Sequence, residues 1–145
     1  MEKQKKYKIH FAPVQGITDW TYRNIHAEFF GGVDAYYTPF IRVEKEDSFR
    51  SRDIKDCDPE LNSVELLVPQ VLGGEPMELD VCLQMLEGRG YKQVDINMGC
   101  PFTMISRRGK GAGLLPHPER VEALMEVVKD FPEIQCSVKM RLGWE

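Results

Sequence analysis

Hydrophobic positions along the chain follow two alternating patterns. Short apolar runs, of the length of a buried strand, are separated by stretches in which apolar residues recur every three or four positions, as in an amphipathic helix. The strand-like runs are residues 9–14, 34–40, 64–71, 93–97 and 134–141. Strands that alternate with helices in this way predict parallel βα units and therefore an α/β fold.

The helix-like stretches begin and end at typical residues. Thr18-Asp19 offers an N-cap for the first helix and Gly31-Gly32 stops it, whereas Pro76 and Pro118 open the second and third. Each stretch places a set of apolar side chains on one helical face. These sets are Tyr22, Ile25, His26 and Phe29; Leu79, Cys82, Leu83 and Leu86; and Val121, Leu124, Met125 and Val128. Residues 42–63 show no clear period and are predicted to form a long loop that could carry a short helix.

Two α/β architectures fit this alternation, an open doubly wound sheet and a (β/α)8 barrel. A doubly wound nucleotide-binding fold usually carries a glycine-rich fingerprint after its first strand, but here only Gly16 follows residues 9–14. A (β/α)8 TIM barrel needs about 200–250 residues, and this chain has 145. We therefore expect residues 1–145 to form the first part of such a barrel, about four to five βα units.

Composition excludes some functions. Apolar residues make up 42% and charged residues 29% of the chain, as in an ordinary globular protein. No apolar run has the length of a membrane span and no signal-peptide pattern opens the chain, so a cytoplasmic protein without a membrane partner is expected. The net charge of −4 argues against coating nucleic acid through bulk positive charge.

The four cysteines predict free thiols rather than a metal site, because none belongs to a Cys-x-x-Cys pair or has a histidine at a zinc-ligand spacing. They are Cys57, Cys82, Cys100 and Cys136. Cys100 differs from the others because Gly99 and Pro101 flank it. Such turn-forming residues would hold a thiol at the edge of a loop, which favours chemistry there without excluding an ordinary buried cysteine.

In a (β/α)8 barrel the functional groups gather at the carboxyl ends of the strands. That rule selects polar or reactive residues in apolar surroundings, namely Pro13, Val14, Gln15, Gln70, Asn97, Cys100, Lys139 and Arg141. A buried amide or ammonium needs a partner, so Gln70 could instead satisfy a neighbouring backbone group and Lys139 could pair with a carboxylate inside the barrel. The basic loop at residues 106–110 (S-R-R-G-K) could be a solvated surface turn.

Five ordered motifs carry a resemblance to a known family. They are A-P-V-Q-G-I-T-D at residues 12–19, V-P-Q-V-L-G at 68–73, D-I-N-M-G-C-P at 95–101, G-K-G-A-G-L-L at 109–115 and S-V-K-M-R-L-G-W at 137–144. In this order they resemble the motifs of the flavin-dependent tRNA-dihydrouridine synthases. Any one motif alone is weakly specific, whereas the five together span the whole chain.

The resemblance implies an FMN cofactor, bound at the carboxyl ends of the strands and reduced by NADPH. By motif position, the backbone of Pro13, Val14 and Gln15 would border the isoalloxazine ring. Gln70 would hydrogen-bond the polar edge of the ring. Lys139 would lie near N1 and O2, where a cation stabilises the anionic reduced flavin.

The resemblance also implies the reaction, which is reduction of the 5,6 double bond of a uridine in the D-loop of tRNA. Flavin N5 would deliver a hydride to C6, Cys100 would deliver a proton to C5, and Asn97 would face the uracil edge as both donor and acceptor. A free thiol is mostly protonated at neutral pH, which suits a proton donor. The base would have to turn out of its stacked loop to reach the pocket.

For tRNA binding, the resemblance points to basic side chains. Arg107, Arg108 and Lys110 would contact tRNA phosphates near the pocket, and Arg42 would orient the tRNA. Arg42 and residues 142–144 (L-G-W) favour the subgroup that acts on position 16 of the D-loop.

Met104 departs from the family pattern, which often has a lysine four residues after the catalytic cysteine. The later half of the barrel and the C-terminal helical domain that grips tRNA are expected to be absent from residues 1–145, so this piece alone is expected to be inactive. The sequence leaves the oligomeric state open.

Two other interpretations remain. One is an FMN barrel of the dihydroorotate dehydrogenase type that acts on a free small molecule, and the other is a non-catalytic RNA-binding relic of the barrel. The opening motif and the basic loop favour the tRNA enzyme over the first. The presence of both Cys100 and Lys139 disfavours the second, because simple binding needs neither.

Overall fold

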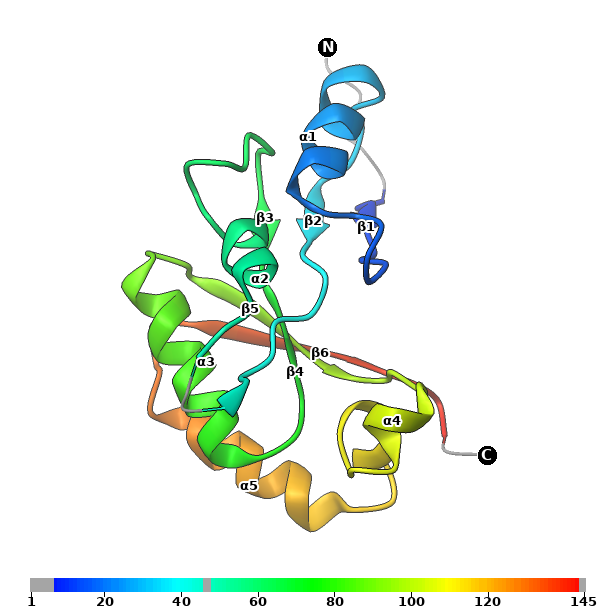
Figure 1. Ribbon diagram of the computed structural model, residues 1–145, viewed down its shortest axis with the longest axis vertical. Helices are drawn as coiled ribbons and strands as arrows, with labels where there is room; N and C mark the ends of the chain where they lie inside the picture. The colour runs from blue at the N-terminus through cyan, green and yellow to red at the C-terminus, as the bar shows by residue number, and fades with distance from the viewer. Residues whose placement is uncertain (1–6, 46–47, 144–145) are drawn as a thin grey trace.

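A computed structural model describes residues 7–45 and 48–143. Helices and strands alternate along the chain, as predicted (Figure 1). They are β1 (His10–Phe11), α1 (Trp20–Phe29), β2 (Ala35–Tyr37), α2 (Ser51–Asp56), β3 (Leu67–Val68), β4 (Gln70–Leu72), α3 (Pro76–Gly88), β5 (Gln93–Met98), α4 (Thr103–Ser106), the 3₁₀ helix η2 (Gly111–Leu114), α5 (Pro118–Lys129) and β6 (Gln135–Met140).

Parallel strands form two sheets that succeed one another in chain order. The first sheet has the order β1-β2-β3 and the second β4-β5-β6, and each pair of neighbours is parallel. Backbone hydrogen bonds connect the strands across the break: Ile41 N donates to Gln70 O at 2.8 Å, and Asp95 N donates to Pro69 O at 2.9 Å. The α/β class with parallel strands is therefore confirmed.

Pro69 divides the third predicted strand. The run at residues 64–71 predicts one strand, but the chain forms β3 and β4, two short strands on either side of Pro69. Proline has no backbone N–H to donate to a ladder. β1 and β2 are also shorter than predicted, with two and three residues. The prediction of one continuous third strand is wrong, although its residues keep their place between the second and fourth predicted strands.

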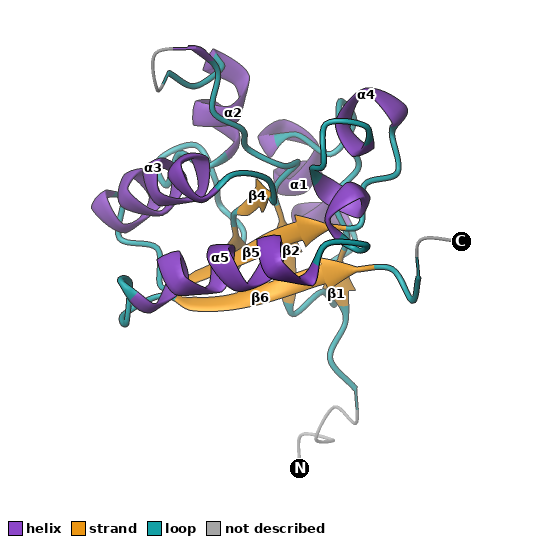
Figure 2. Cartoon of the chain, turned by 90° about the horizontal axis from the view of Figure 1, so that it is seen from below, coloured by secondary structure: helices purple, strands orange, loops and turns teal. Residues whose placement is uncertain are grey.

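Helices α3 and α5 pack against each other and cover one face of the β4-β5-β6 sheet (Figures 1 and 2). Both helices begin at the predicted proline. The apolar side chains predicted to share a face of α3 are all buried. The core between helices and sheet includes Val71, Leu79, Leu83, Leu86, Val94, Ile96 and Leu124.

The strand β5 shows how this core directs polar groups to one place. Successive side chains of a strand point to opposite faces. Val94, Ile96 and Met98 belong to the core under the helices, so Asp95 and Asn97 point to the other face of the sheet. The face covered by helices is therefore apolar, and the opposite face carries polar side chains.

Helix α1 forms where predicted, and the Asp19 side chain caps it by accepting from Tyr22 N at 2.9 Å. Its predicted apolar face does not face a core, however, because Tyr22, Ile25 and Phe29 are 43%, 51% and 72% exposed. The helix instead buries Arg23, whose guanidinium hydrogen-bonds to the end of α2 and the segment after it. Figure 1 shows α1 at one end of the molecule. Of its predicted apolar face, only His26 is half-buried, where its ring packs against Phe11 and Tyr36.

Three short helices lie where the sequence has no regular period. α2 lies within residues 42–63, in the loop predicted to have room for a short helix. α4 and η2 lie between Cys100 and Pro118, where the pattern predicts no element. Helices of only four residues leave too few positions for a periodic signal. Within the described ranges, no helix is long and apolar enough to cross a bilayer.

Truncation of Leu83 tests the assigned core. Leu83 is fully buried, so Leu83→Ala is expected to lower the free energy of unfolding by about 2–5 kcal/mol. Met77→Ala on the same helix is the control, because Met77 is 73% exposed and such surface changes cost about 0.5 kcal/mol or less. Urea denaturation followed by circular dichroism measures both, and equal losses would contradict the assigned core.

Candidate active site

The carboxyl ends of the strands surround a cavity of about 240 Å³. Its lining includes every residue that the sequence assigns to catalysis or to cofactor binding. Asn97 and Lys139 lie near the ends of β5 and β6, Cys100 follows β5, and Gln70 begins β4 directly after Pro69. Pro13, Val14 and Gln15 come from the loop after β1. Residues separated by more than a hundred positions in the sequence therefore meet at one place, as the barrel rule predicts.

A chain of hydrogen bonds runs beside the cavity. Asp95 Oδ2 accepts from Gln70 Nε2 at 2.7 Å, and Gln70 Oε1 accepts from Asn97 Nδ2 at 2.9 Å. Because a carboxylate can only accept, it fixes which end of each amide faces its neighbour. Asn97 Oδ1 is thereby turned toward the backbone N–H groups of Gly99, at 3.1 Å, and Cys100, at 2.9 Å. The carboxylate thus orients the turn that carries the thiol.

Asp95 is only 4% exposed and has no ion pair with any residue in the described ranges. Its Oδ1 accepts from Ser137 Oγ at 2.7 Å, and in the sheet register it lies opposite both Gln70 and Ser137. These contacts tie β4, β5 and β6 together. Sequence reasoning did not select Asp95 or Ser137. The strand alternation in V-D-I-N-M could have found Asp95, because it places this residue on the same face as Asn97.

The turn at Cys100 is also held from outside by η2. Ala112 N donates to Cys100 O at 3.0 Å. Gly111 has a φ of +56°, and a Cβ on it would stand 2.9 Å from Cys100 O and 3.0 Å from Cys100 Cβ. Glycine is therefore required at this close approach. The glycine-rich motif at residues 109–115 thus has a structural role in bracing the thiol's turn.

Lys139 is exposed on β6, opposite Asn97 in the register. The alternative that Lys139 pairs with a carboxylate is not seen in the part of the chain that the structure describes. Asp95, which lines a neighbouring hollow together with Lys139, is already engaged by Gln70 and Ser137. The ammonium of Lys139 is therefore available to an electron-rich group in the cavity.

Arg141 also lines the cavity, although the sequence gives it no role beyond its place at a strand end. Its Nε donates to Gly99 O at 2.8 Å. Gly99 itself lies against β6, where a Cβ would stand 3.3 Å from the carbonyl carbon of Met140. Arg141 thus links the end of β6 to the turn of Cys100.

Among the four cysteines, only Cys100 lines the cavity. Cys57 and Cys82 are buried in the core, where desolvation raises the pKa of their thiols to about 11 and about 12. Burial also raises the pKa of the half-buried Cys136 thiol. Because the thiolate is the nucleophilic form, these three are poor nucleophiles at neutral pH. Cys100 is the candidate for chemistry.

The basic residues predicted to bind tRNA lie outside this cavity. Arg42, Arg108 and Lys110 line a smaller hollow of about 130 Å³ together with Met104. Arg107 is exposed and lies outside that hollow. The structure therefore gathers three of the four predicted cations at one place beside the cavity.

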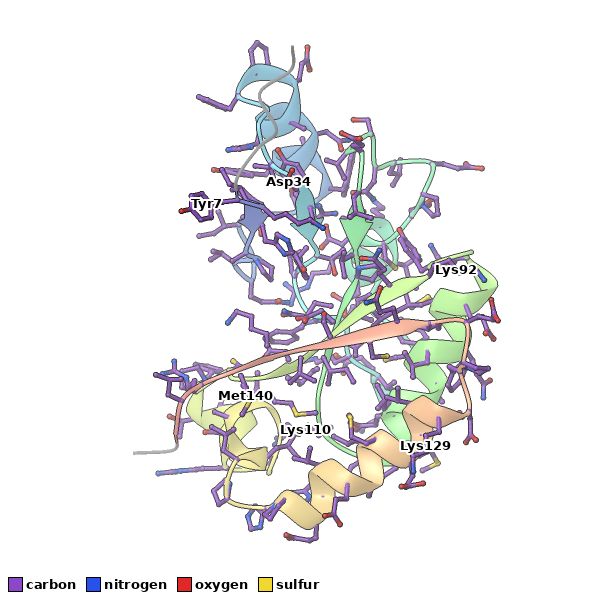
Figure 3. All side chains as sticks on the ribbon, turned by 180° about the vertical axis from the view of Figure 1, so that it is seen from behind. Tyr7, Asp34, Lys92, Lys110, Lys129 and Met140 are labelled. Atoms are coloured by element: carbon purple, nitrogen blue, oxygen red, sulfur yellow. The ribbon has the colours of Figure 1, made fainter. Side chains whose placement is uncertain are left out.

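Two of these cations already have acidic partners. Arg42 Nε lies 2.9 Å from Glu44 Oε1, on the surface, where ion pairs are weak and screened by salt. Lys110 Nζ lies 2.5 Å from both carboxylate oxygens of Glu78 and is half-buried. Figure 3 shows Lys110 in the segment between α4 and α5. Lys110 therefore has a structural contact in addition to its predicted role.

The cavity suits one side of a planar cofactor. Pro13, Val14 and Phe40 supply apolar surface, Gln70 keeps one amide N–H without a partner in the described ranges, and Lys139 supplies a cation. Its volume of about 240 Å³ is below the about 300–1,000 Å³ of ordinary ligand sites. The described chain therefore fits one wall of a flavin site and does not enclose a flavin. No cluster of His, Cys, Asp and Glu in the described ranges could hold a metal ion.

Comparison with known proteins finds a matching family and curated relatives. The family model described as "Dihydrouridine synthase (Dus)" matches residues 10–145. Curated relatives named tRNA-dihydrouridine synthase B include that of Klebsiella pneumoniae, 28% identical over 98% of this chain and 43% of its own length. The relative from Serratia marcescens is 30% identical over 92% of this chain and 39% of its own length. The chain thus spans less than half the length of these relatives.

Thiol labelling tests the assignment of Cys100. Iodoacetamide at neutral pH is expected to modify Cys100 first, because it is the cysteine at the cavity. Cys57 and Cys82 should react only after denaturation, because burial raises the pKa of both thiols and blocks access to them. Mass spectrometry of the digested protein measures the order. Labelling of either buried cysteine at the rate of Cys100 would contradict the assignment.

Proposed function

The chain belongs to the dihydrouridine synthase family, and on that premise we propose that it is part of an enzyme that reduces uridine to dihydrouridine in tRNA, with FMN as cofactor. The observation that carries this proposal is the cavity at which Cys100, Asn97, Gln70 and Lys139 converge. Relatives named tRNA-dihydrouridine synthase B support tRNA as the substrate. Because the chain spans about two fifths of their length, the activity is proposed for a longer protein.

FMN would lie against the loop after β1 and the strand ends. Pro13, Val14 and Gln15 would border the isoalloxazine ring, and Gln70 would donate its remaining amide N–H to the polar edge of the ring. Lys139 would place its ammonium near N1 and O2 and stabilise negative charge there. When bound and reduced by NADPH, the flavin supplies the hydride that C6 of the uracil receives.

Cys100 would donate a proton to C5 of the uracil, and the thiolate left behind would take a proton from solvent. One hydride and one proton together saturate the 5,6 double bond. Asn97 Oδ1 already accepts from two backbone N–H groups, and one of its own N–H groups is bonded to Gln70. Asn97 can therefore donate one N–H to the uracil. Its oxygen is already engaged, so it is not free to act as the acceptor that the resemblance of the motifs implies.

The substrate would be a uridine of the D-loop, turned out of its stack into the cavity. Arg107 and Arg108, which have no acidic partner in the described ranges, are best placed to contact phosphates of the flanking nucleotides. Arg42 would join them by leaving Glu44 for a phosphate, whereas the bond of Lys110 to Glu78 limits its reach. Trp144, which contributes to the preference for position 16, lies outside the described residues.

We further propose that residues 1–145 form the first part of a (β/α)8 barrel. The strands are parallel and follow chain order, and β1 and β6 are both edge strands in the described chain. Val138 and Met140 of β6 are 41% and 62% exposed, and Figure 3 shows Met140 near the end of that strand. Open edges with exposed apolar side chains call for a cover. The remaining strands and a C-terminal helical domain that grips tRNA would come from the rest of a longer protein.

The two rival functions make different use of the same site. A flavin barrel that acts on a free small molecule would not need the arginines beside the cavity, and the family match disfavours it. A non-catalytic relic would bind RNA without flavin and would need neither Cys100 nor Lys139. The yellow colour of the purified longer protein separates the relic from both enzymes.

Complementation tests the reaction and the proton donor together. The full-length gene is expected to restore dihydrouridine in a strain that lacks it, and Cys100→Ala should lower the rate of formation by about 100-fold or more, because a general acid contributes on that scale. Mass spectrometry of digested tRNA measures the nucleoside, and sequencing of the D-loop fragment tests the preference for position 16. Cys136→Ala is the control, since Cys136 lies outside the cavity. Failure of the wild-type gene, or full activity of Cys100→Ala, would overturn the assignment.

The piece alone provides a second test. Residues 1–145 expressed by themselves are expected to retain little FMN and to reduce no uridine, because the cavity offers only one wall. The flavin absorbance of the purified piece, divided by its protein concentration, measures the retained cofactor. Stoichiometric FMN in that preparation would contradict the idea that the site is incomplete.

A further inference from the structure

The loop after β1, which borders the cavity, is held by one buried residue. Residues 12–17 are exposed or half-buried, whereas Thr18 is only 3% exposed. Thr18 Oγ1 accepts from Val14 N at 2.8 Å and donates to Val14 O at 3.3 Å. Thr18 N and Ile17 N also donate to Val14 O, at 3.1 and 3.0 Å. Both polar backbone groups of Val14, a residue lining the cavity, are therefore fixed by Thr18 and its neighbour.

Thr18 is in turn held by Arg23. Arg23 Nη1 donates to Thr18 O at 2.8 Å. Arg23 Nη2 donates to Asp56 O at 2.6 Å and to Asn62 Oδ1 at 2.7 Å. The guanidinium thus joins three segments: the loop after β1, the end of α2, and the segment before β3.

Because the guanidinium of Arg23 is buried, it needs hydrogen-bond partners within the protein. Arg23 is 0% exposed, and its Nε has no hydrogen-bond partner in the described ranges. The carboxylate of Asp56 lies 3.5 Å from Nη1 and also accepts from Trp20 N at 2.8 Å, which anchors the start of α1. A buried charge is tolerated only where partners surround it. The planar fork of arginine donates from two terminal nitrogens held at a fixed separation, whereas lysine would have to donate from a single nitrogen.

The hydrogen bonds of Arg23 are more than α1 needs to stay attached to the segment before β3. Asn24, the next residue on the helix, already ties α1 to the same segment before β3, because its Nδ2 donates to Leu61 O at 2.8 Å and its Oδ1 accepts from Ser63 N at 3.0 Å. Only Arg23 adds a bond to Thr18. Thr18 in turn bonds to Val14, which lines the cavity.

We propose that Arg23 is a positioning residue for the cofactor site, acting through Thr18 to set the place of the Val14 backbone against the flavin. The proposal rests on the proposed function to the extent that this loop borders FMN. Asp56 at the end of α2 thus supports, through Arg23 and Thr18, the loop formed by the first motif, residues 12–19.

The test compares variants of the full-length protein. Thr18→Val keeps the size of the side chain and removes the hydroxyl, Thr18→Ser keeps the hydroxyl, and Arg23→Lys keeps the charge. Asn24→Ala is the matched control, since it removes two hydrogen bonds from the same helix without touching the loop. The readouts are the FMN dissociation constant from flavin fluorescence, the hydrogen exchange rate of the Val14 amide without FMN, and the melting temperature.

Thr18→Val and Arg23→Lys are expected to weaken FMN binding by about tenfold, the effect of losing one or two buried hydrogen bonds, and to speed exchange at Val14. Thr18→Ser should restore both. Asn24→Ala should lower the melting temperature while leaving FMN affinity and Val14 exchange unchanged.

The readouts separate failure of this proposal from failure of the proposed function. If wild type binds FMN and Thr18→Val binds it equally, with unchanged exchange at Val14, the positioning role is overturned. If wild type binds no FMN, the proposed function fails, and the exchange of the Val14 amide still decides whether Thr18 and Arg23 hold the loop. If Arg23→Lys does not fold, the pair Thr18→Val and Thr18→Ser gives the answer.

Discussion

The buried carboxylate of Asp95 is the constraint on which the site depends. It lies 4% exposed on the polar face of β5 and accepts one hydrogen bond from each neighbouring strand. A desolvated carboxylate must find donors, and Gln70 on one side and Ser137 on the other supply them. This requirement fixes the direction of the Gln70 amide, then that of Asn97, and finally the backbone of Cys100. A one-residue slip of β5 would carry Asp95 and Asn97 to the apolar face under the helices.

The two sides of the cavity are held by different means. On the strand side, the parallel sheet and its hydrogen-bonded side chains give a rigid support, reinforced where η2 contacts the turn of Cys100. On the loop side, the backbone of Val14 is held by Thr18 and, behind it, by the buried Arg23. A cofactor between the two would depend on both. The hydrogen bonds of Thr18 and Arg23 explain why an exposed loop with little core of its own can keep a defined position.

Much of the site follows from the sequence because its residues lie in strand ends and tight turns. The rule that function gathers at the carboxyl ends of parallel strands finds Gln70, Asn97, Cys100 and Lys139 without any contact information. The pattern of α1 fails for a physical reason: periodicity shows which side chains share a face, but not whether any element covers that face. Tyr22, Ile25 and Phe29 share a face and are exposed, while the charged Arg23 is the buried residue. Local pattern also missed the break at Pro69, where one apolar run serves two sheets.

The sequence by itself determined the α/β class, the order of the strands, the two long helices and the family to which the chain belongs. These follow from local periodicity, from capping and turn residues, and from motifs that are each contiguous in the chain. Only the tertiary structure decided the partners of the buried and half-buried polar groups: Asp95 with Ser137, Lys110 with Glu78, and Arg23 with Thr18 and Asn62. These partners are 42, 32, 5 and 39 positions apart. Their pairing is set by register and packing, which no local pattern of polar and apolar residues encodes.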